Sequence, residues 1–280
     1  MLSFHKKCDA ALRRWREQFS CDDSACTSLG WIWKPVSKRF SGLRIHGAQF
    51  CFPGCFEQKL LQRFTRLLST APVNERRAHR IPLGLTLLSR GDIDDTQLRQ
   101  ALSAQRAGGE GRIGEWMQRL GFIGERQVTA ALGGQWACPV LPRVPDICDD
   151  SHLPLALLRR FHMAAVSYVA ATRTMHVAFS EGIDYSVLLA IEQVLECRAE
   201  PCVAGRSALA LLWARMEEAP RRSDQVFTNV CTPDEMTRIT ASYAAMLKAH
   251  DVRLTRCAEF IWARVDAGEA SANLLFPAAE

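Results

Sequence analysis

The sequence lacks the patterns that would place the chain in or across a membrane. No apolar run among its 280 residues reaches the roughly 18 residues that a membrane-spanning helix requires. The first 19 residues, MLSFHKKCDAALRRWREQF, are basic and amphipathic but contain no apolar core or cleavage site, which excludes a secretory signal. Asp9 and Glu17 argue against a mitochondrial-type transit peptide. We therefore expect a cytoplasmic protein with no transmembrane segment.

Patterns of catalytic residues are missing as well. The sequence contains no G-x-x-x-x-G-K-[ST] motif, so it has no phosphate-cradling P-loop. His152, His162 and His176 are dispersed, and their spacing matches neither a metalloprotease nor a hydrolytic triad. We expect these histidines to be structural and the chain not to be an enzyme.

Charge is distributed unevenly along the chain. Residues 1–80 contain 15 lysines and arginines and 6 acidic residues, a net charge of +9, whereas the remainder has a net charge of −4. A basic segment can meet an anionic partner such as nucleic acid, a membrane face or an acidic protein. The alternative is an ordinary solvated surface with many arginines. Because we favour this alternative, we do not expect nucleic acid to be a partner.

The order of the segments suggests three domains separated by two linkers. Residues 1–70 are irregular, contain several cysteines and have a helix near each end, and residues 71–80 form a polar linker. Residues 81–216 form a central domain, followed by a second linker, MEEAPRRSDQ, at 216–225. Residues 226–280 are predicted to form a small α+β domain.

The C-terminal segment contains well-marked local signals. A helix is expected from about Pro233 to Ala249, because Thr232 can act as N-cap, Pro233 lies at the first helical position and Glu235 completes a capping box. Strand character follows at Val252, Leu254 and residues 260–265.

Residues 82–105 and 112–135 repeat one another at an offset of 30 residues, without a gap. Seven of the 24 aligned positions are identical. The identical pairs are Gly84/Gly114, Gly91/Gly121, Ile93/Ile123, Gln97/Gln127, Ala101/Ala131, Leu102/Leu132 and Gln105/Gln135. Self-similarity at a fixed period indicates an internal structural repeat.

Each repeat is predicted to form a helix, a glycine turn and a second helix. Residues 84–90 form the first helix, and Gly91 falls just after its end, where a left-handed backbone costs little only for glycine. Asp94 caps the second helix, with Gln97 as its capping-box partner. Residues 106–111, RAGGEG, form a flexible joint between the units.

Two polar positions of the repeat have two possible roles. Gln105 and Gln135 each end an apolar helical stripe, at a place where leucine would pack better. They are either half-exposed side chains at a helix end or hydrogen-bonding groups directed at a ligand. Arg112 precedes Gly114 at a helix start, which is an anion site in principle.

The tandem pattern R-L-G-x-x-L, then Gly, then L-x-x-x-L-x-x-Q resembles the MshEN family. This is the N-terminal regulatory domain of type II secretion and type IV pilus assembly ATPases. The following stretch, from GGQWACPVLPRVP to Met216, resembles the family's second part. The resemblance covers residues 80–216 and implies an α+β fold, with a helical tandem-repeat subdomain followed by a small α/β subdomain. The expected strands are 164–170, 174–179 and 199–203, and the expected helices that follow them are 185–195 and 206–216.

The family implies cyclic di-GMP as the ligand. This molecule is two-fold symmetric, so each of two similar units can hold one half. Leucines would contact base and sugar faces, and glutamine and arginine would supply polar contacts. The positions carried over from the family are Arg80, Leu83, Gly84, Leu98, Leu102, Gln105, Arg112, Ile113, Gly114, Val128, Leu132, Gln135 and Glu181.

The chain departs from the family pattern at two of its site positions. Pro82 stands where the first motif has arginine, and proline supplies neither charge nor an N–H group. Glu181 stands where the family tends to have aspartate. An adaptor that keeps the fold but has lost the nucleotide is therefore a second hypothesis.

Two close pairs of cysteines lie in the N-terminal segment. Cys21 and Cys26 are separated by 24 residues from Cys51 and Cys55, a spacing typical of four thiolates around structural zinc. FCFPGCFEQKL resembles the second knuckle of treble-clef zinc modules, in which a tight turn leads into a helix. Cys8 and His46 are alternative ligands, and unpaired thiols in a small helical domain are the alternative interpretation. A basic zinc module that binds nucleic acid is the third hypothesis for function.

Overall fold

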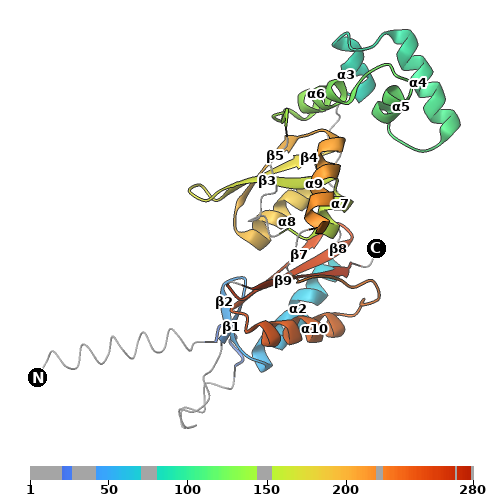
Figure 1. The fold of residues 1–280 in the computed structure, drawn as a ribbon. Helices are drawn as coiled ribbons and strands as arrows, with labels where there is room; N and C mark the ends of the chain where they lie inside the picture. Colours follow the sequence, from blue (N-terminus) through green and yellow to red (C-terminus); the bar gives the residue numbers. More distant parts are fainter. Residues whose placement is uncertain are drawn as a thin grey trace, which may run out of the picture. The chain divides into compact units, whose positions relative to one another are not determined.

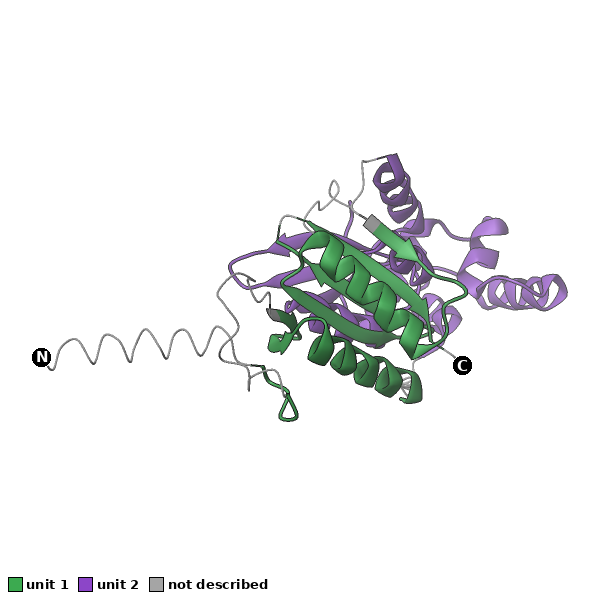
Figure 2. Ribbon diagram, turned by 90° about the horizontal axis from the view of Figure 1, so that it is seen from below, with its two compact units in different colours: residues 1–72, 222–280 green, residues 73–221 purple. Residues whose placement is uncertain are grey.

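The computed structural model describes residues 21–26, 42–70, 81–143, 153–218, 223–268 and 270–278. The chain divides into two compact units, one formed by residues 1–72 together with 222–280 and the other by residues 73–221 (Figures 1 and 2). Both α-helices and β-sheets are present, as the sequence predicts. Within the described ranges, no helix is both long and apolar enough to cross a bilayer.

The first unit contains a six-stranded mixed sheet with the order β2-β1-β7-β8-β9-β6. Its pairs β1–β7 and β6–β9 are parallel and the others are antiparallel. The strands are β1 (Gly42–Ile45), β2 (Ala48–Cys51), β6 (Ser223–Val226), β7 (Asp251–Cys257), β8 (Phe260–Asp266) and β9 (Ser271–Pro277). His46 and Gly47 join β1 to β2 with φ angles of 50° and 81°, so both adopt the left-handed backbone that a two-residue hairpin needs.

Two helices of this unit pack together and cover one face of the sheet (Figure 2). They are α2 (Gly54–Ser69) and α10 (Pro233–Leu247). The apolar face of α2 contributes Phe56, Leu60 and Phe64, all fully buried. These side chains form one core with alternate residues of β7, β8 and β9, as expected for a sheet with one face packed against helices.

The separation of residues 1–70 and 226–280 into two domains is corrected by this sheet. Arg44 and Ile45 of β1 pair directly with Asp251 and Val252 of β7. The Arg256 guanidinium also donates hydrogen bonds to the Leu67 and Leu68 carbonyls at 3.2 and 3.4 Å, at the end of α2. The two chain ends therefore fold as one unit, because each supplies part of a core that the other lacks.

The second linker is also shorter than the sequence suggests. Helix α9 (Arg206–Glu218) continues two residues past the expected Met216, and Ser223–Val226 forms the edge strand β6. The pairing of β6 with β9 orders this segment. The Asn273 amide donates to Asp224 at 2.8 Å and accepts from the Trp262 indole at 3.0 Å.

The predicted C-terminal helix is confirmed in its start and its N-cap, but the Glu235 carboxylate accepts from the Thr232 hydroxyl at 3.0 Å and not from the backbone N–H that a capping box uses. The Thr232 hydroxyl accepts from the Glu235 N–H at 3.3 Å, and Pro233 is the first residue of α10. The helix ends at Leu247, where Lys248 takes a left-handed conformation. The strand character predicted at Val252, Leu254 and residues 260–265 corresponds to β7 and β8.

The second unit contains a three-stranded sheet and the helical repeats. The sheet has the order β3-β4-β5, with β3 (Met163–Val169), β4 (Thr174–Phe179) and β5 (Arg198–Val203). Helices α7 (Leu155–Arg160), α8 (Tyr185–Leu195) and α9 accompany it. Strand β4 is antiparallel to β3 and parallel to β5. The three strands, α8 and α9 lie within one or two residues of the sequence prediction at each end.

Candidate functional site

The two repeats fold into the same local structure. The first comprises α3 (Leu83–Ser89) and α4 (Asp95–Gly108), and the second α5 (Ile113–Arg119) and α6 (Glu125–Trp136). Helix α4 takes in residues 106–108 of the predicted joint, because Gly109, not Arg106, ends it with a positive φ. The helix–turn–helix prediction is confirmed in both copies.

The glycine after the first helix serves the predicted role in each copy. Gly91 and Gly121 both have a φ of 73°. The next residue in each case, Asp92 or Phe122, donates its N–H to the carbonyl of Leu87 or Met117 at 3.0 Å. This bond, to a residue five positions earlier, satisfies a carbonyl that the ending helix leaves without an intrahelical partner.

The second helix of each repeat starts with a related cap. Asp94 accepts from the Gln97 N–H at 2.8 Å, while the Asp94 N–H donates to the Gln97 side chain at 3.0 Å, which completes the predicted capping box. In the second copy Gly124 takes the place of Asp94, so only the glutamine half remains, from the Gly124 N–H to Gln127 at 3.1 Å. The next residue, Glu125, aligns with Asp95 and bonds outside the repeats.

The two repeats are intertwined rather than stacked one after the other. Helix α4 of the first copy packs on α5 of the second, and α6 of the second packs on α3 of the first. The starts of α3 and α5 also meet, since a β-carbon on Gly114 would lie 3.2 Å from Leu83 Cδ2. Related residues from both copies line this shared core: Leu87 and Met117, Ile93 and Ile123, Leu98 and Val128, and Ala101 and Ala131.

The two glutamines make equivalent bonds across the repeats. The Gln105 amide donates to the Gly111 carbonyl at 2.8 Å, and the Gln135 amide donates to the Ile81 carbonyl at 2.6 Å. Gly111 and Ile81 occupy the same position, directly before Arg112 and Pro82. Each copy therefore holds the start of the other copy's first helix, in an arrangement that follows an approximate two-fold relation.

Gly84 and Gly114 are buried and serve the packing of this core. A β-carbon on residue 84 would lie 2.7 Å from Leu98 Cδ1, and one on residue 114 would lie 3.3 Å from Val128 Cγ1. Glycine at these places lets the two helices of each repeat approach closely.

Pro82 preserves the backbone of the motif while it removes the arginine side chain. It is the N-cap of α3 with φ −54° and ψ 141°, and Arg112 is the N-cap of α5 with φ −87° and ψ 155°. Their carbonyls accept equivalent bonds, at 3.0 Å from the N–H of Leu85 and of Glu115. The two copies differ here in charge and not in fold.

Arg112 forms an ion pair with another predicted site residue, Glu181. Arg112 Nη2 lies 2.8 Å from Glu181 Oε2. Glu181 follows β4, and its side chain is only 12% exposed, while that of Arg112 is 64% exposed. The structure thus brings together two of the polar residues that the family pattern singles out, from segments about 70 positions apart in the chain.

A second polar contact joins the repeats to the three-stranded sheet. Ser207, in the first turn of α9, donates its N–H to Glu125 Oε1 at 2.8 Å and its hydroxyl to Oε2 of the same carboxylate. A carboxylate at a helix N-terminus is stabilised by the unpaired N–H groups and the helix dipole. Arg112, Glu125 and also Glu115, which pairs with Arg206 of α9, all belong to the second repeat.

The remaining predicted ligand positions lie in and around the core of the repeats. Leu98 is buried, with 8% of its surface exposed, so it packs between helices. Partly exposed positions are Leu83, Leu102, Ile113, Val128 and Leu132. Arg80 lies outside the described residues.

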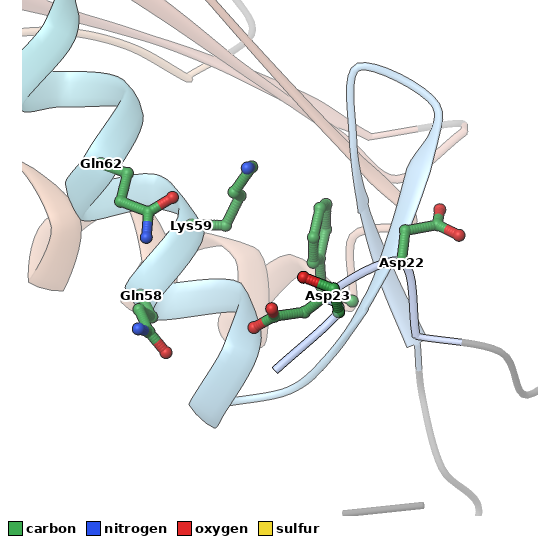
Figure 3. Close-up of a pocket in the computed structure, with 7 residues that line it drawn as sticks. Asp22, Asp23, Gln58, Lys59 and Gln62 are labelled. Atoms are coloured by element: carbon green, nitrogen blue, oxygen red, sulfur yellow. The ribbon is translucent and has the colours of Figure 1, made fainter. Parts of the chain in front are cut away.

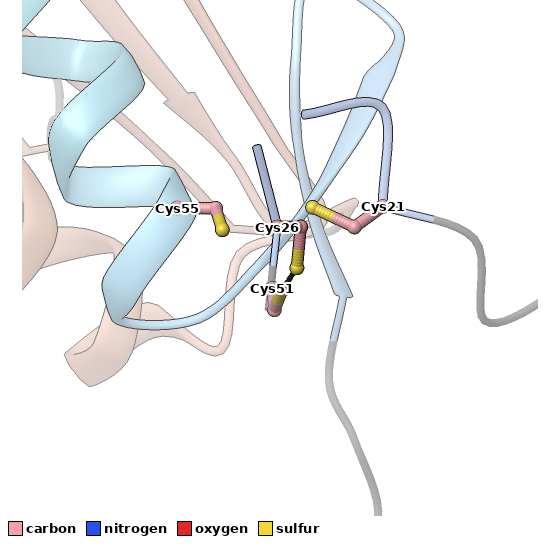
Figure 4. Close-up of side chains that lie close together, drawn as sticks. All are labelled: Cys21, Cys26, Cys51 and Cys55. Carbon is pink, nitrogen blue, oxygen red and sulfur yellow. Dashed lines mark hydrogen bonds between the residues drawn. The ribbon is translucent and has the colours of Figure 1, made fainter. Parts of the chain in front are cut away.

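The four predicted metal ligands meet in the first unit (Figure 4). The sulfur atoms of Cys21, Cys26, Cys51 and Cys55 all lie within 4.8 Å of one another. Cys51 ends β2, and Cys55 lies in the first turn of α2, so the predicted turn leading into a helix is confirmed. Tetrahedral zinc with bonds of about 2.3 Å places its sulfur ligands about 3.8 Å apart, which this cluster can accommodate.

The four clustered thiols resist ionisation unless a cation is bound. Burial raises the pKa of the Cys55 thiol, and hydrogen bonds with the other three thiols and Asp23 raise it further. Clustered thiols ionise together only where a positive charge compensates them. His46, an alternative ligand, is instead bonded through Nε2 to Leu254 and lies outside the cluster, and Cys8 lies outside the described residues.

A shallow polar depression lies beside this cluster (Figure 3). Its lining consists of Gln58, Lys59 and Gln62 of α2 together with Asp22, Asp23, Ser24 and Phe50. Asp22 also pairs with Gln49 on β2. The Gln49 N–H donates to the Asp22 carboxylate at 2.7 Å, and the Asp22 N–H donates to the Gln49 carbonyl at 2.8 Å. The segment 21–26 is thus fixed to the sheet edge by both backbone and side-chain contacts.

No protein-family model and no curated protein matches the chain. Among solved structures, it is similar to one described as MshE with cdg. The identity is 28%, the match covers 49% of this chain and 99% of that chain, and the TM-score is 0.41. Two crystal forms of the N-terminal domain of XpsE match at 21% identity, with TM-scores of 0.36 and 0.30. They cover 48% and 52% of this chain and 92% and 98% of their own.

Two charged residues and a histidine of this region were not identified from the sequence as part of the site. Arg206, Glu115 and His162 lie around the Arg112–Glu181 pair. His162 was expected to be structural, and Arg206 and Glu115 belong to ordinary helical patterns. The pairs that they form join residues 19 to 91 positions apart, so no local pattern could have found them.

Proposed function

We propose that the intertwined repeats bind cyclic di-GMP and that the chain is a non-catalytic regulator or adaptor of a type II secretion or type IV pilus system. The observation that carries the proposal is the reciprocal glutamine bonding, Gln105 to Gly111 and Gln135 to Ile81. It relates the two motifs by an approximate two-fold exchange. A ligand with two equal halves is the natural partner of such a pair of motifs.

The chemistry of the second motif supports the proposal further. The Arg112 guanidinium is largely exposed at the start of α5. Guanidinium groups bind phosphate oxygens and guanine edges through pairs of parallel hydrogen bonds. The first motif offers the same backbone but has Pro82 at this place, so we expect unequal contributions from the two halves.

The experiment is calorimetric titration of the full chain with cyclic di-GMP, with GMP as a comparison ligand. We expect Arg112→Ala to weaken binding by at least about tenfold, the equivalent of about 1.4 kcal/mol. Arg99→Ala is the matched control, since Arg99 is an exposed arginine of α4 paired only locally with Asp95. This control should bind as the parent chain does.

Restoring the missing arginine tests the two-fold reasoning. Pro82→Arg should tighten binding, because arginine already adopts similar backbone angles at residue 112. No binding by the parent chain at high micromolar ligand would refute the proposal. That result would favour the adaptor that has lost the nucleotide, whose capture of a secretion or pilus protein is indifferent to cyclic di-GMP.

We also propose that the four cysteines hold a structural zinc ion. Cys21, Cys26, Cys51 and Cys55 would be its ligands, and the ion would tie the segment 21–26 to the sheet edge. A metal of this kind contributes directly to the free energy of folding. Metal analysis of the purified chain should find about one zinc per molecule, and a metal-free chain of full stability would exclude the ion.

A further inference from the structure

The Glu181 carboxylate is surrounded by three nitrogen-bearing side chains in the second unit. Arg112 Nη2 lies 2.8 Å from it, His162 Nδ1 3.5 Å and Arg206 Nη2 3.7 Å. Arg206 also pairs with a second carboxylate, that of Glu115 on α5. The cluster therefore contains two arginines, a histidine and two acids, drawn from the repeats and from the sheet.

The positions of these groups make the pair with Arg112 the easiest one to exchange. Arg112 is the only one of the three that comes from the repeats, and its side chain is 64% exposed. An anion in solution can therefore reach it. Glu181 is only 12% exposed, and a buried carboxylate left alone is costly. Arg206 and His162 remain beside it if Arg112 turns away, so that cost is limited.

The pair also lies at a packed junction. A β-carbon on Gly182 would lie 3.3 Å from the Trp136 ring and 3.9 Å from Arg112 Nη1. Trp136 is the last residue of α6. The residue before it, Gln135, donates a hydrogen bond to the Ile81 carbonyl at the start of the first repeat. If Arg112 exchanges Glu181 for another partner, the packing between the repeats and the loop after β4 therefore changes.

We infer that Glu181 is an internal competitor that occupies Arg112 until a phosphate-bearing ligand takes its place. The inference rests on the proposed function, and it gives Glu181 a role opposite to that of a ligand contact. Glu181 holds the guanidinium in position and is displaced by the ligand's phosphate. Arg206 is a positioning residue, because it shares the carboxylate and so weakens the hold of Glu181 on Arg112.

The test compares binding of cyclic di-GMP by the full chain and three variants. Glu181→Gln keeps the shape and removes the competing charge, and we expect it to bind about two- to fivefold more tightly, the range of a weak ion pair. Arg206→Gln should bind more weakly, since Glu181 then relies on Arg112. Glu217→Gln is the control, because it breaks an exposed pair with Arg159, at 2.5 Å, on the same unit.

The outcomes separate the inference from the function on which it rests. Unchanged or weaker binding by Glu181→Gln, while the parent chain binds, overturns the inference and makes Glu181 a ligand contact or a bystander. No binding by any form, including the parent chain, overturns both. Hydrogen exchange without ligand is a second measurement. Faster exchange at residues 111–116 in Glu181→Gln supports the hold on Arg112, and unchanged exchange there contradicts it.

Discussion

Gly84→Ala tests whether the motif's glycine is required by the packing of the repeats. The added β-carbon would lie 2.7 Å from Leu98 Cδ1, about 1 Å inside the usual contact distance of about 3.5–4.0 Å. Leu98 is buried and packs in a core that also holds Met117, whose Cε would lie 3.8 Å from the same atom. The leucine side chain must shift to admit the added carbon, and it must do so within a core that also contains Leu87 and Ala101.

The expected loss is the difference between two terms. Overpacking a well-filled core costs about 1–3 kcal/mol, and replacing glycine by alanine in a helix gains up to about 1 kcal/mol. Residue 84 is only the second residue of the short helix α3, so the gain is at the low end. We expect a net destabilisation of about 1–2 kcal/mol, or about 2–8 °C in Tm for a unit of this size.

The assay is thermal and urea unfolding followed by circular dichroism, with Gly134→Ala as the matched control. A β-carbon on Gly134, in the last turn of α6, would have no neighbour within 4 Å. The control should therefore be neutral or slightly stabilised. If the two variants unfold alike, the glycine is not required for packing, and the conserved spacing of the two copies needs another explanation.

Three further predictions concern other parts of the molecule. Gln135→Ala removes the hydrogen bond to the Ile81 carbonyl. We expect the free energy of unfolding, measured by urea denaturation, to fall by about 0.5–1.5 kcal/mol. A loss well below this range would mean that the glutamine is not a brace. Cys51→Ser should release metal and destabilise the first unit, whereas the exposed Cys231→Ser should change neither metal content nor Tm. Burial and, to a smaller extent, the charge of Arg63 lower the pKa of His46 from its ordinary 6.5. As the pH falls, the unfolded state therefore takes up a proton on this residue before the folded state does. Stability should therefore fall as the pH drops below about 6.5, and His46→Asn should reduce this dependence in urea titrations at pH 5 and 7.5. An identical pH dependence in both forms would contradict this role for His46.

The local structure of the repeats could be predicted from the sequence because its signals act over short distances. The turns at Gly91 and Gly121 and the cap at Asp94 involve residues no more than about five positions apart. The same holds for the start of α10 at Thr232. The bounds of β3, β4, α8 and α9 followed to within two residues, since hydrophobic periodicity also acts locally.

The interplay of the two copies could not be predicted in the same way. The sequence left open whether Gln105 and Gln135 end a helix or face a ligand, and the structure gives each a backbone carbonyl of the other copy as partner. It also left Arg206 and Glu115 without a role. Such contacts depend on whether a helix packs on its own repeat or on the other one. The two copies have similar apolar faces, so the sequence does not distinguish these arrangements.

The sequence by itself determined a doubled helical motif, an α/β continuation and four cysteines with the spacing of a metal site. Their local geometry follows from glycine conformation, capping and periodicity. Only the tertiary structure decided that residues 42–51 and 223–277 contribute strands to one sheet, and that Arg112 meets Glu181. The sheet joins residues about 200 positions apart. At that separation, pairing is set by the burial of complementary faces, which no short stretch of sequence records.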